Sequence, residues 1–185
     1  MRLLPAVLYT ALLIGANAAM AGPDAARALR HGDMRKLNFA TPAAVPDTAV
    51  TGLDGGEARL ADFAGRYTLV NFWATWCAPC RREMPGLAAL QRDFGGDAFQ
   101  VVTVATGRNP VPAVKKFLAE AGVDNLPVYL DPRSGLARQM GILGLPITVI
   151  LDPEGREIAR LIGDADWSGD SARAVIGALM EAPHD

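Results

Sequence analysis

Residues 68–85 read TLVNFWATWCAPCRREMP, and this segment sets the expectations for the rest of the chain. The run from Thr68 to Trp73 is β-branched and aromatic, which predicts a short buried strand. From Ala78 to about Phe94 the apolar residues recur at helical spacing, and two glycines end the pattern. The cysteines Cys77 and Cys80 therefore lie where a strand leads into the N-terminus of a helix.

These two cysteines are the only ones in the 185-residue chain. A disulfide between them would close a very short loop, so it would restrain little of the unfolded chain as a structural staple. A zinc site needs about four ligands, and only His31 and His184 remain, which we treat as surface residues. Thiol–disulfide chemistry is the use that suits the pair.

The start of a helix carries unpaired N–H groups and partial positive charge. Such a site stabilises a thiolate, so we expect the pKa of Cys77 to lie below the value of about 8.5 for free cysteine. Pro79 suits the first helical turn because its missing N–H has no helical partner there. The prediction is that Cys77 attacks a disulfide and that Cys80, nearly one turn further, resolves the mixed disulfide.

The remaining chain predicts one α/β domain over residues 49–185, with a mixed central sheet and helices on both faces. A turn at residues 54–57 predicts a small hairpin, and a turn at 152–155 joins the last two strands. Further strands are expected at 99–104, 128–130, 148–151 and 157–162, and helices at 111–121, 134–140 and 168–180. Residues 22–48 are rich in Ala, Pro and charge without periodicity, which predicts a flexible linker or arm.

The N-terminus predicts export. Residues 3–16 are almost wholly apolar after the single charge of Arg2, and Ala19-Met20-Ala21 offers a cleavage site. We expect residues 1–21 to be a signal peptide, with an uncleaved anchor in the inner membrane as the alternative. Either outcome places the domain in the periplasm, where disulfides persist. The net charge of −2, without a dense Lys/Arg cluster, argues against a nucleic-acid partner.

Three segments resemble one protein family. Residues 72–85, FWATWCAPCRREMP, resemble the active-site segment of the TlpA/ResA branch of the thioredoxin superfamily. Residues 144–155, GLPITVILDPEG, resemble the family's cis-proline strand, and residues 163–167, GDADW, are similar to the stretch before the last helix in TlpA-type members. The match covers roughly residues 49–180. It implies a thioredoxin-like fold and a thiol–disulfide oxidoreductase that needs no cofactor and no metal.

The resemblance also implies a docking surface for substrates. Pro146 would follow a cis peptide bond, pack against the disulfide and offer backbone groups to a substrate. Leu145 would line the same surface, with a core position as its alternative role. Trp76 would shield the pair and contact partners, with a half-buried packing role as the alternative. Ala78 and Pro79, between the cysteines, complete this surface.

Glu83 is the most informative residue outside the pair. It lies three positions after Cys80, so helical geometry puts the two on neighbouring faces. Thioredoxins carry a buried Asp where this chain has Asn71, whereas the ResA branch has an acid at the position that Glu83 matches. The resemblance implies that burial raises the pKa of Glu83 and that it exchanges a proton with Cys80. The alternative is an exposed carboxylate paired with Arg82 or another Arg.

The strongest oxidants of the superfamily commonly carry a His between the cysteines, and this chain has none there. We therefore predict a reducing pair. The resemblance implies recharging by a membrane thiol carrier of the DsbD/CcdA type. It also implies clients with metal-site cysteine pairs: oxidase subunit II, a copper chaperone or apocytochrome c. The GDADW segment favours the copper-site clients.

Some features depart from this pattern and leave alternatives. Some TlpA proteins have a second, structural cysteine pair that is absent here, and Ile147 stands where CcmG-type proteins carry an acid. A general periplasmic disulfide oxidase or isomerase remains an alternative, as does a peroxide-reducing thiol enzyme. A Sco-type copper carrier is disfavoured because no His lies between His31 and His184.

Overall fold

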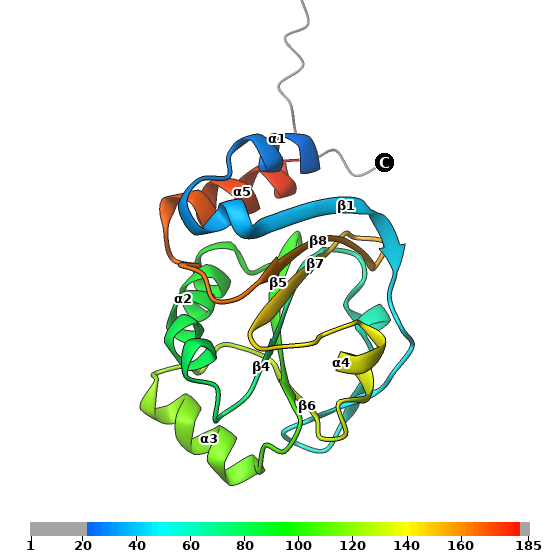
Figure 1. Cartoon of the computed structure of the whole chain (residues 1–185), viewed down its shortest axis with the longest axis vertical. Coiled ribbons are helices and arrows are strands. Elements are labelled where there is room, and N and C mark those ends of the chain that lie inside the picture. Colours follow the sequence, from blue (N-terminus) through cyan, green and yellow to red (C-terminus); the bar gives the residue numbers. More distant parts are fainter. Residues whose placement is uncertain (1–21, 182–185) are drawn as a thin grey trace, which may run out of the picture.

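The computed structural model describes residues 22–181, which form an eight-stranded sheet in the order β1-β8-β7-β4-β5-β6-β2-β3 (Figure 1). The strands are β1 (Leu37–Ala44), β2 (Val50–Gly52), β3 (Glu57–Ala58), β4 (Tyr67–Trp73), β5 (Phe99–Thr106), β6 (Val128–Asp131), β7 (Ile147–Leu151) and β8 (Arg156–Ile162). The helices are α1 (Pro23–Ala28), α2 (Ala78–Phe94), α3 (Val111–Glu120), α4 (Gly135–Gln139) and α5 (Asp170–Met180), with 3-10 turns η1 (Gly32–Lys36) and η2 (Leu60–Phe63).

Strand β4 is central, and all of its residues are buried. It runs parallel to β5 and antiparallel to β7, so the sheet is mixed. Parallel neighbours need a crossover connection, which α2 supplies between β4 and β5 and α3 supplies between β5 and β6. A strand covered on both faces needs an apolar run without alternation, and the sequence of β4 supplies it.

Two apolar cores lie on opposite faces of this sheet. The larger core contains buried side chains of α1, α2, α3 and α5, and the smaller one contains side chains of α4 and η2. Leu69 and Val70 are successive residues of β4 and enter different cores, as strand geometry requires. The predicted architecture, an α/β sheet flanked by helices on both faces, is confirmed.

The predicted elements after residue 49 agree closely with the structure. The helix predicted over residues 78–94 coincides with α2, and the ends of the other predicted helices and strands differ by at most two residues. The predicted hairpins are β2–β3 and β7–β8.

The prediction of a flexible linker over residues 22–48 is wrong for most of its length. Helix α1 packs on α5, and β1 pairs antiparallel with β8. Met34 and Leu37 are almost fully buried. The sequence does not predict this docking, because Leu37 is the only buried residue of β1 and the strand therefore shows no alternation. Helix α1 also has only six residues.

The predicted signal peptide or anchor falls on residues 1–21, outside the described residues, and so does His184. Across residues 22–181, none of the helices combines the length and the apolar character that a membrane crossing requires.

Candidate active site

Cys77 and Cys80 form a disulfide at the N-terminus of α2. Cys77 is the residue before the first helical turn, and its Sγ accepts a hydrogen bond from the backbone N–H of Cys80 at 3.3 Å. Cys77 is 5% exposed, whereas Cys80 is fully buried. The cysteine at the helix terminus is therefore also the more accessible residue of the pair.

The register of the sheet brings the cis-proline segment to the same edge as the cysteines. Phe72 of β4 pairs with Ile147 of β7, so the start of β7 lies beside the end of β4, just before the cysteine pair. The Leu145–Pro146 peptide bond is cis, as the resemblance predicts. The carbonyl of Pro146 already accepts a hydrogen bond from the N–H of Gly163 at 3.0 Å.

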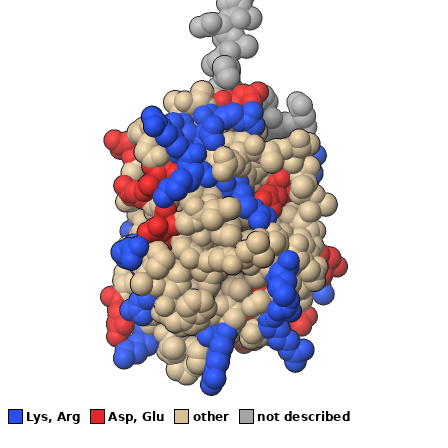
Figure 2. Space-filling view, viewed as in Figure 1, with Lys and Arg blue, Asp and Glu red and all other residues tan. Residues whose placement is uncertain are grey.

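The other predicted docking residues differ in exposure. Trp76 is 67% exposed, so the alternative of a half-buried packing role does not apply to it. Leu145 is partly buried and packs against both cores, which leaves part of its surface available. Ala78 is exposed and Pro79 is half-buried. Figure 2 shows that the surface between α2 and α4 in this view is largely uncharged, with Lys, Arg, Asp and Glu around it.

Glu83 is buried, at 4% exposure, on the larger-core side of α2. Its Oε1 accepts a hydrogen bond from Asn71 Nδ2 at 2.7 Å. Its Oε2 accepts two more, from the Ala165 N–H and from Trp167 Nε1, both at 3.1 Å. Burial raises the pKa of this carboxyl group from 4.5 to about 7, although the three donors oppose the shift. A carboxyl group with a pKa near neutrality can both accept and release a proton.

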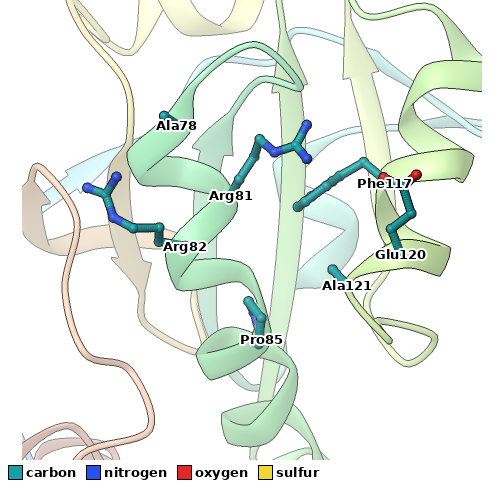
Figure 3. Close-up of a pocket in the computed structure, with 7 residues that line it drawn as sticks. All are labelled: Ala78, Arg81, Arg82, Pro85, Phe117, Glu120 and Ala121. Atoms are coloured by element: carbon teal, nitrogen blue, oxygen red, sulfur yellow. The ribbon is translucent and has the colours of Figure 1, made fainter.

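The alternative role for Glu83, an exposed carboxylate paired with Arg82, is wrong. Arg82 instead pairs with Asp164, with 3.0 Å between Nη2 and Oδ2. Figure 3 shows that Arg81 and Arg82 leave α2 on different sides. Arg81 extends toward α3, and its guanidinium lies 4.6 Å from the ring centroid of Phe117.

Sequence reasoning missed the donors to Glu83. Asn71 stands where thioredoxins carry a buried Asp, and its Nδ2 donates both to Glu83 and to Thr148 Oγ1, the latter at 2.9 Å, which connects β7 to Glu83. Trp167 and Ala165 lie more than 80 positions from Glu83. The only available signal was general: a buried carboxylate requires hydrogen-bond donors.

Within the described part of the chain, no group of three or more His, Cys, Asp or Glu residues is arranged to hold a metal ion. His31 is exposed, and its backbone N–H donates to Ser171 Oγ at 2.9 Å.

A disulfide at a helix N-terminus, a cis-proline at the same sheet edge and a buried carboxyl group one turn beyond define a thiol–disulfide oxidoreductase of thioredoxin fold. The comparison with protein families agrees with this class. The chain belongs to the AhpC/TSA family, whose model matches residues 42–158.

Named relatives narrow the class further. The thiol-disulfide oxidoreductase ResA of Geobacillus kaustophilus is 32% identical over 127 residues, which cover 69% of this chain and 71% of that protein. ResA of Geobacillus thermodenitrificans is 32% identical over 121 residues, covering 65% and 68%. A solved structure from Chlorobium tepidum, assigned as the thiol:disulfide interchange protein DsbE, superposes with a TM-score of 0.68 at 27% identity, covering 77% of this chain and 99% of that one. The protein is therefore a thiol–disulfide oxidoreductase of the ResA/DsbE type.

Proposed function

We propose that this protein is exported to the periplasm and reduces disulfides in client proteins, with Cys77 as the attacking and Cys80 as the resolving cysteine. The observation that carries the proposal is the Cys77–Cys80 disulfide at the start of α2, with the sulfur of Cys77 facing a backbone N–H. That geometry favours negative charge on Cys77 once the disulfide is reduced.

The reaction begins with the reduced pair. The Cys77 thiolate attacks one sulfur of a client disulfide, forms a mixed disulfide and releases the other client sulfur as a thiolate. Cys80 then loses its proton and attacks the Cys77 sulfur. This second step releases the remaining client thiolate and restores the Cys77–Cys80 disulfide. Two electrons pass to the client in each cycle.

Glu83 serves this second step as a proton acceptor. It lies one helical turn after Cys80 and is buried, and its pKa of about 7 allows it to hold either state near neutral pH. When the pair is reduced again, Glu83 returns the proton to Cys80.

The client docks on the surface around the pair. Trp76 supplies exposed aromatic area beside Cys77. Ala78, Pro79 and Leu145 extend this surface, and Pro146 lies at the adjacent sheet edge. An extended client segment would cross this surface, with its disulfide over Cys77.

Electrons come from a membrane thiol carrier of the DsbD/CcdA type, because a reductant in an oxidising compartment needs a source of reduced thiols. The clients are metal-site cysteine pairs, in oxidase subunit II, a copper chaperone or apocytochrome c. The apolar N-terminal segment supports export, and the absence of a His between the cysteines supports the reducing direction.

The direction of electron flow is tested by equilibrating the protein with glutathione buffers. We expect a potential closer to about −270 mV, the value for thioredoxin, than to about −120 mV, the value for a periplasmic oxidant. A potential near about −120 mV would instead indicate that the protein is a general disulfide oxidase.

The roles of the cysteines are tested by trapping. The Cys80→Ser variant is mixed with a synthetic peptide that carries a two-residue-spaced disulfide, as in a haem-attachment site. We expect a stable mixed disulfide on Cys77. The matched Cys77→Ser variant should form none. Adducts only on Cys77→Ser would reverse the assignment, and turnover of peroxide in place of peptide would favour the peroxidase alternative.

A further inference from the structure

We propose that the loop of residues 163–169, held between α2 and η1, is the positioning element for Glu83, and that Trp167 is the positioning residue within it. This inference rests on the proposed proton role of Glu83. It goes beyond that role because it assigns a task to the N-terminal segment and to a residue remote in sequence from the cysteine pair.

Most of the hydrogen bonds to Glu83 come from the loop of residues 163–169. Of its three donors, two come from this one loop: the Ala165 N–H and the Trp167 indole N–H, both to Oε2. Asn71 serves the other oxygen. The orientation of the carboxyl group therefore depends on where the loop lies.

Trp167 is buried, with 1% of its surface exposed. A buried indole N–H is stabilised by an acceptor, and for Trp167 this acceptor is Glu83 Oε2. Trp73, also fully buried, has no hydrogen-bond partner for its Nε1 within the described residues. Of these two buried tryptophans, Trp167 donates a hydrogen bond to the Glu83 carboxyl group and Trp73 does not.

The loop also packs closely against α2 at Gly86. A Cβ atom at Gly86 of α2 would lie 3.3 Å from the Ser168 backbone N and 3.5 Å from Trp167 Cβ. Glycine inside a helix costs roughly 1 kcal/mol relative to alanine. Its presence one turn after Glu83 lets the loop contact the helix directly.

Polar contacts from η1 and α2 hold the loop in place. Lys36 of η1 donates from Nζ to the Asp164 carbonyl at 2.6 Å and pairs with Asp33 at 3.0 Å. The Asp166 N–H donates to Asp33 Oδ2 at 3.2 Å. Arg82 of α2 pairs with the Asp164 carboxylate. The turn η1 is therefore linked to Glu83 through this loop.

The charged groups around Glu83 oppose one another. A polar pocket beside the carboxyl group is lined by charged side chains of both signs: Asp33, Lys36, Arg82, Asp164 and Asp166. Asp164 raises the pKa of Glu83, while the hydrogen bonds from Ala165 and Trp167 lower it. Cys77, at the N-cap of α2, and Cys80, in its first turn, are joined in a disulfide and carry no charge. Loss of a donor from the loop should therefore favour the protonated carboxyl group.

The test is a titration of the Glu83 carboxyl carbon by NMR in the full exported domain, oxidised, with isotope-labelled glutamate. The Glu83→Gln variant assigns the signal. In Trp167→Phe we expect the pKa of Glu83 to rise by roughly one pH unit, since a hydrogen bond to a charged group is lost. Trp73→Phe removes an indole N–H that has no partner and should leave the titration unchanged.

A second pair of variants covers the case in which Trp167→Phe does not fold. Lys36→Met loosens the loop from η1 and should alter the titration of Glu83, whereas Arg35→Met, at the neighbouring exposed cation, should not. The proposal is overturned if Trp167→Phe folds and titrates like the wild type, or if Trp73→Phe shifts the titration equally. It is also overturned if Trp167→Phe does not fold and Lys36→Met titrates like Arg35→Met.

The exchange rate with the peptide, measured against pH, separates this proposal from the proposed function. A rate that follows the shifted pKa of Glu83 supports both the positioning role of the loop and the proton role of Glu83. A shifted titration with an unchanged rate profile would remove Glu83 from the mechanism and leave the positioning role of the loop intact.

Discussion

Replacing Glu83 with Gln should change how the stability of the protein depends on pH. The pKa of Glu83 is about 7 in the folded protein against 4.5 ordinarily, so the folded state binds this proton more tightly than the unfolded state. The resulting stabilisation is full below pH 4.5 and is lost as the pH rises through 7. The difference between the two pKa values corresponds to about 3 kcal/mol of unfolding free energy. Gln has nearly the same shape and no such proton.

The assay is urea unfolding of the oxidised proteins, followed at several pH values between about 4 and 8. We expect the free energy of unfolding of Glu83→Gln, relative to the wild type, to rise by about 3 kcal/mol across this range. Glu120→Gln, on the exposed surface of α3, controls for the loss of a surface carboxylate. A difference that stays constant with pH, or that falls, would refute the inference that Glu83 is buried with a raised pKa.

Three further substitutions test other parts of the structure. Leu37→Ala removes a fully buried side chain of β1 and should lower the free energy of unfolding by about 2–5 kcal/mol in urea titrations; an unchanged value would mean that β1 does not dock. Asp131→Ala removes the carboxylate that accepts hydrogen bonds from the N–H groups of Gly135 and Ala137 at the start of α4, and should lower the free energy of unfolding by about 1–2 kcal/mol in the same assay; no loss would mean that these hydrogen bonds do not stabilise α4. Trp76→Ala should lower kcat/KM for a protein disulfide but leave exchange with a small disulfide unchanged; equal losses for both would argue against docking through Trp76.

The sequence predicted the central part of the fold well because its signals are local. The apolar run of β4 and the helical spacing of α2 lie within single windows of sequence, and the glycines that follow α2 mark its end. Because the cysteine pair lies at the junction of these two elements in the sequence, its place at the N-terminus of α2 could also be predicted.

Other parts depend on contacts that leave no local pattern. Strand β1 buries only Leu37, so nothing in its sequence separates it from a linker. The burial of Glu83 was expected from a family resemblance, but its donors were not, because Ala165 and Trp167 lie on a distant loop. The ion pair of Arg82 with Asp164 joins the same two regions.

Disulfide reduction by this protein requires that the N-terminus of α2 hold Cys77 as a thiolate. This requirement is tested most directly by the alkylation rate of the reduced Cys80→Ser variant as a function of pH, since only Cys77 then reacts. We predict a pKa for Cys77 clearly below the value of about 8.5 for free cysteine. A pKa at or above that value would contradict the account, because Cys77 would then lack the reactivity that disulfide reduction requires.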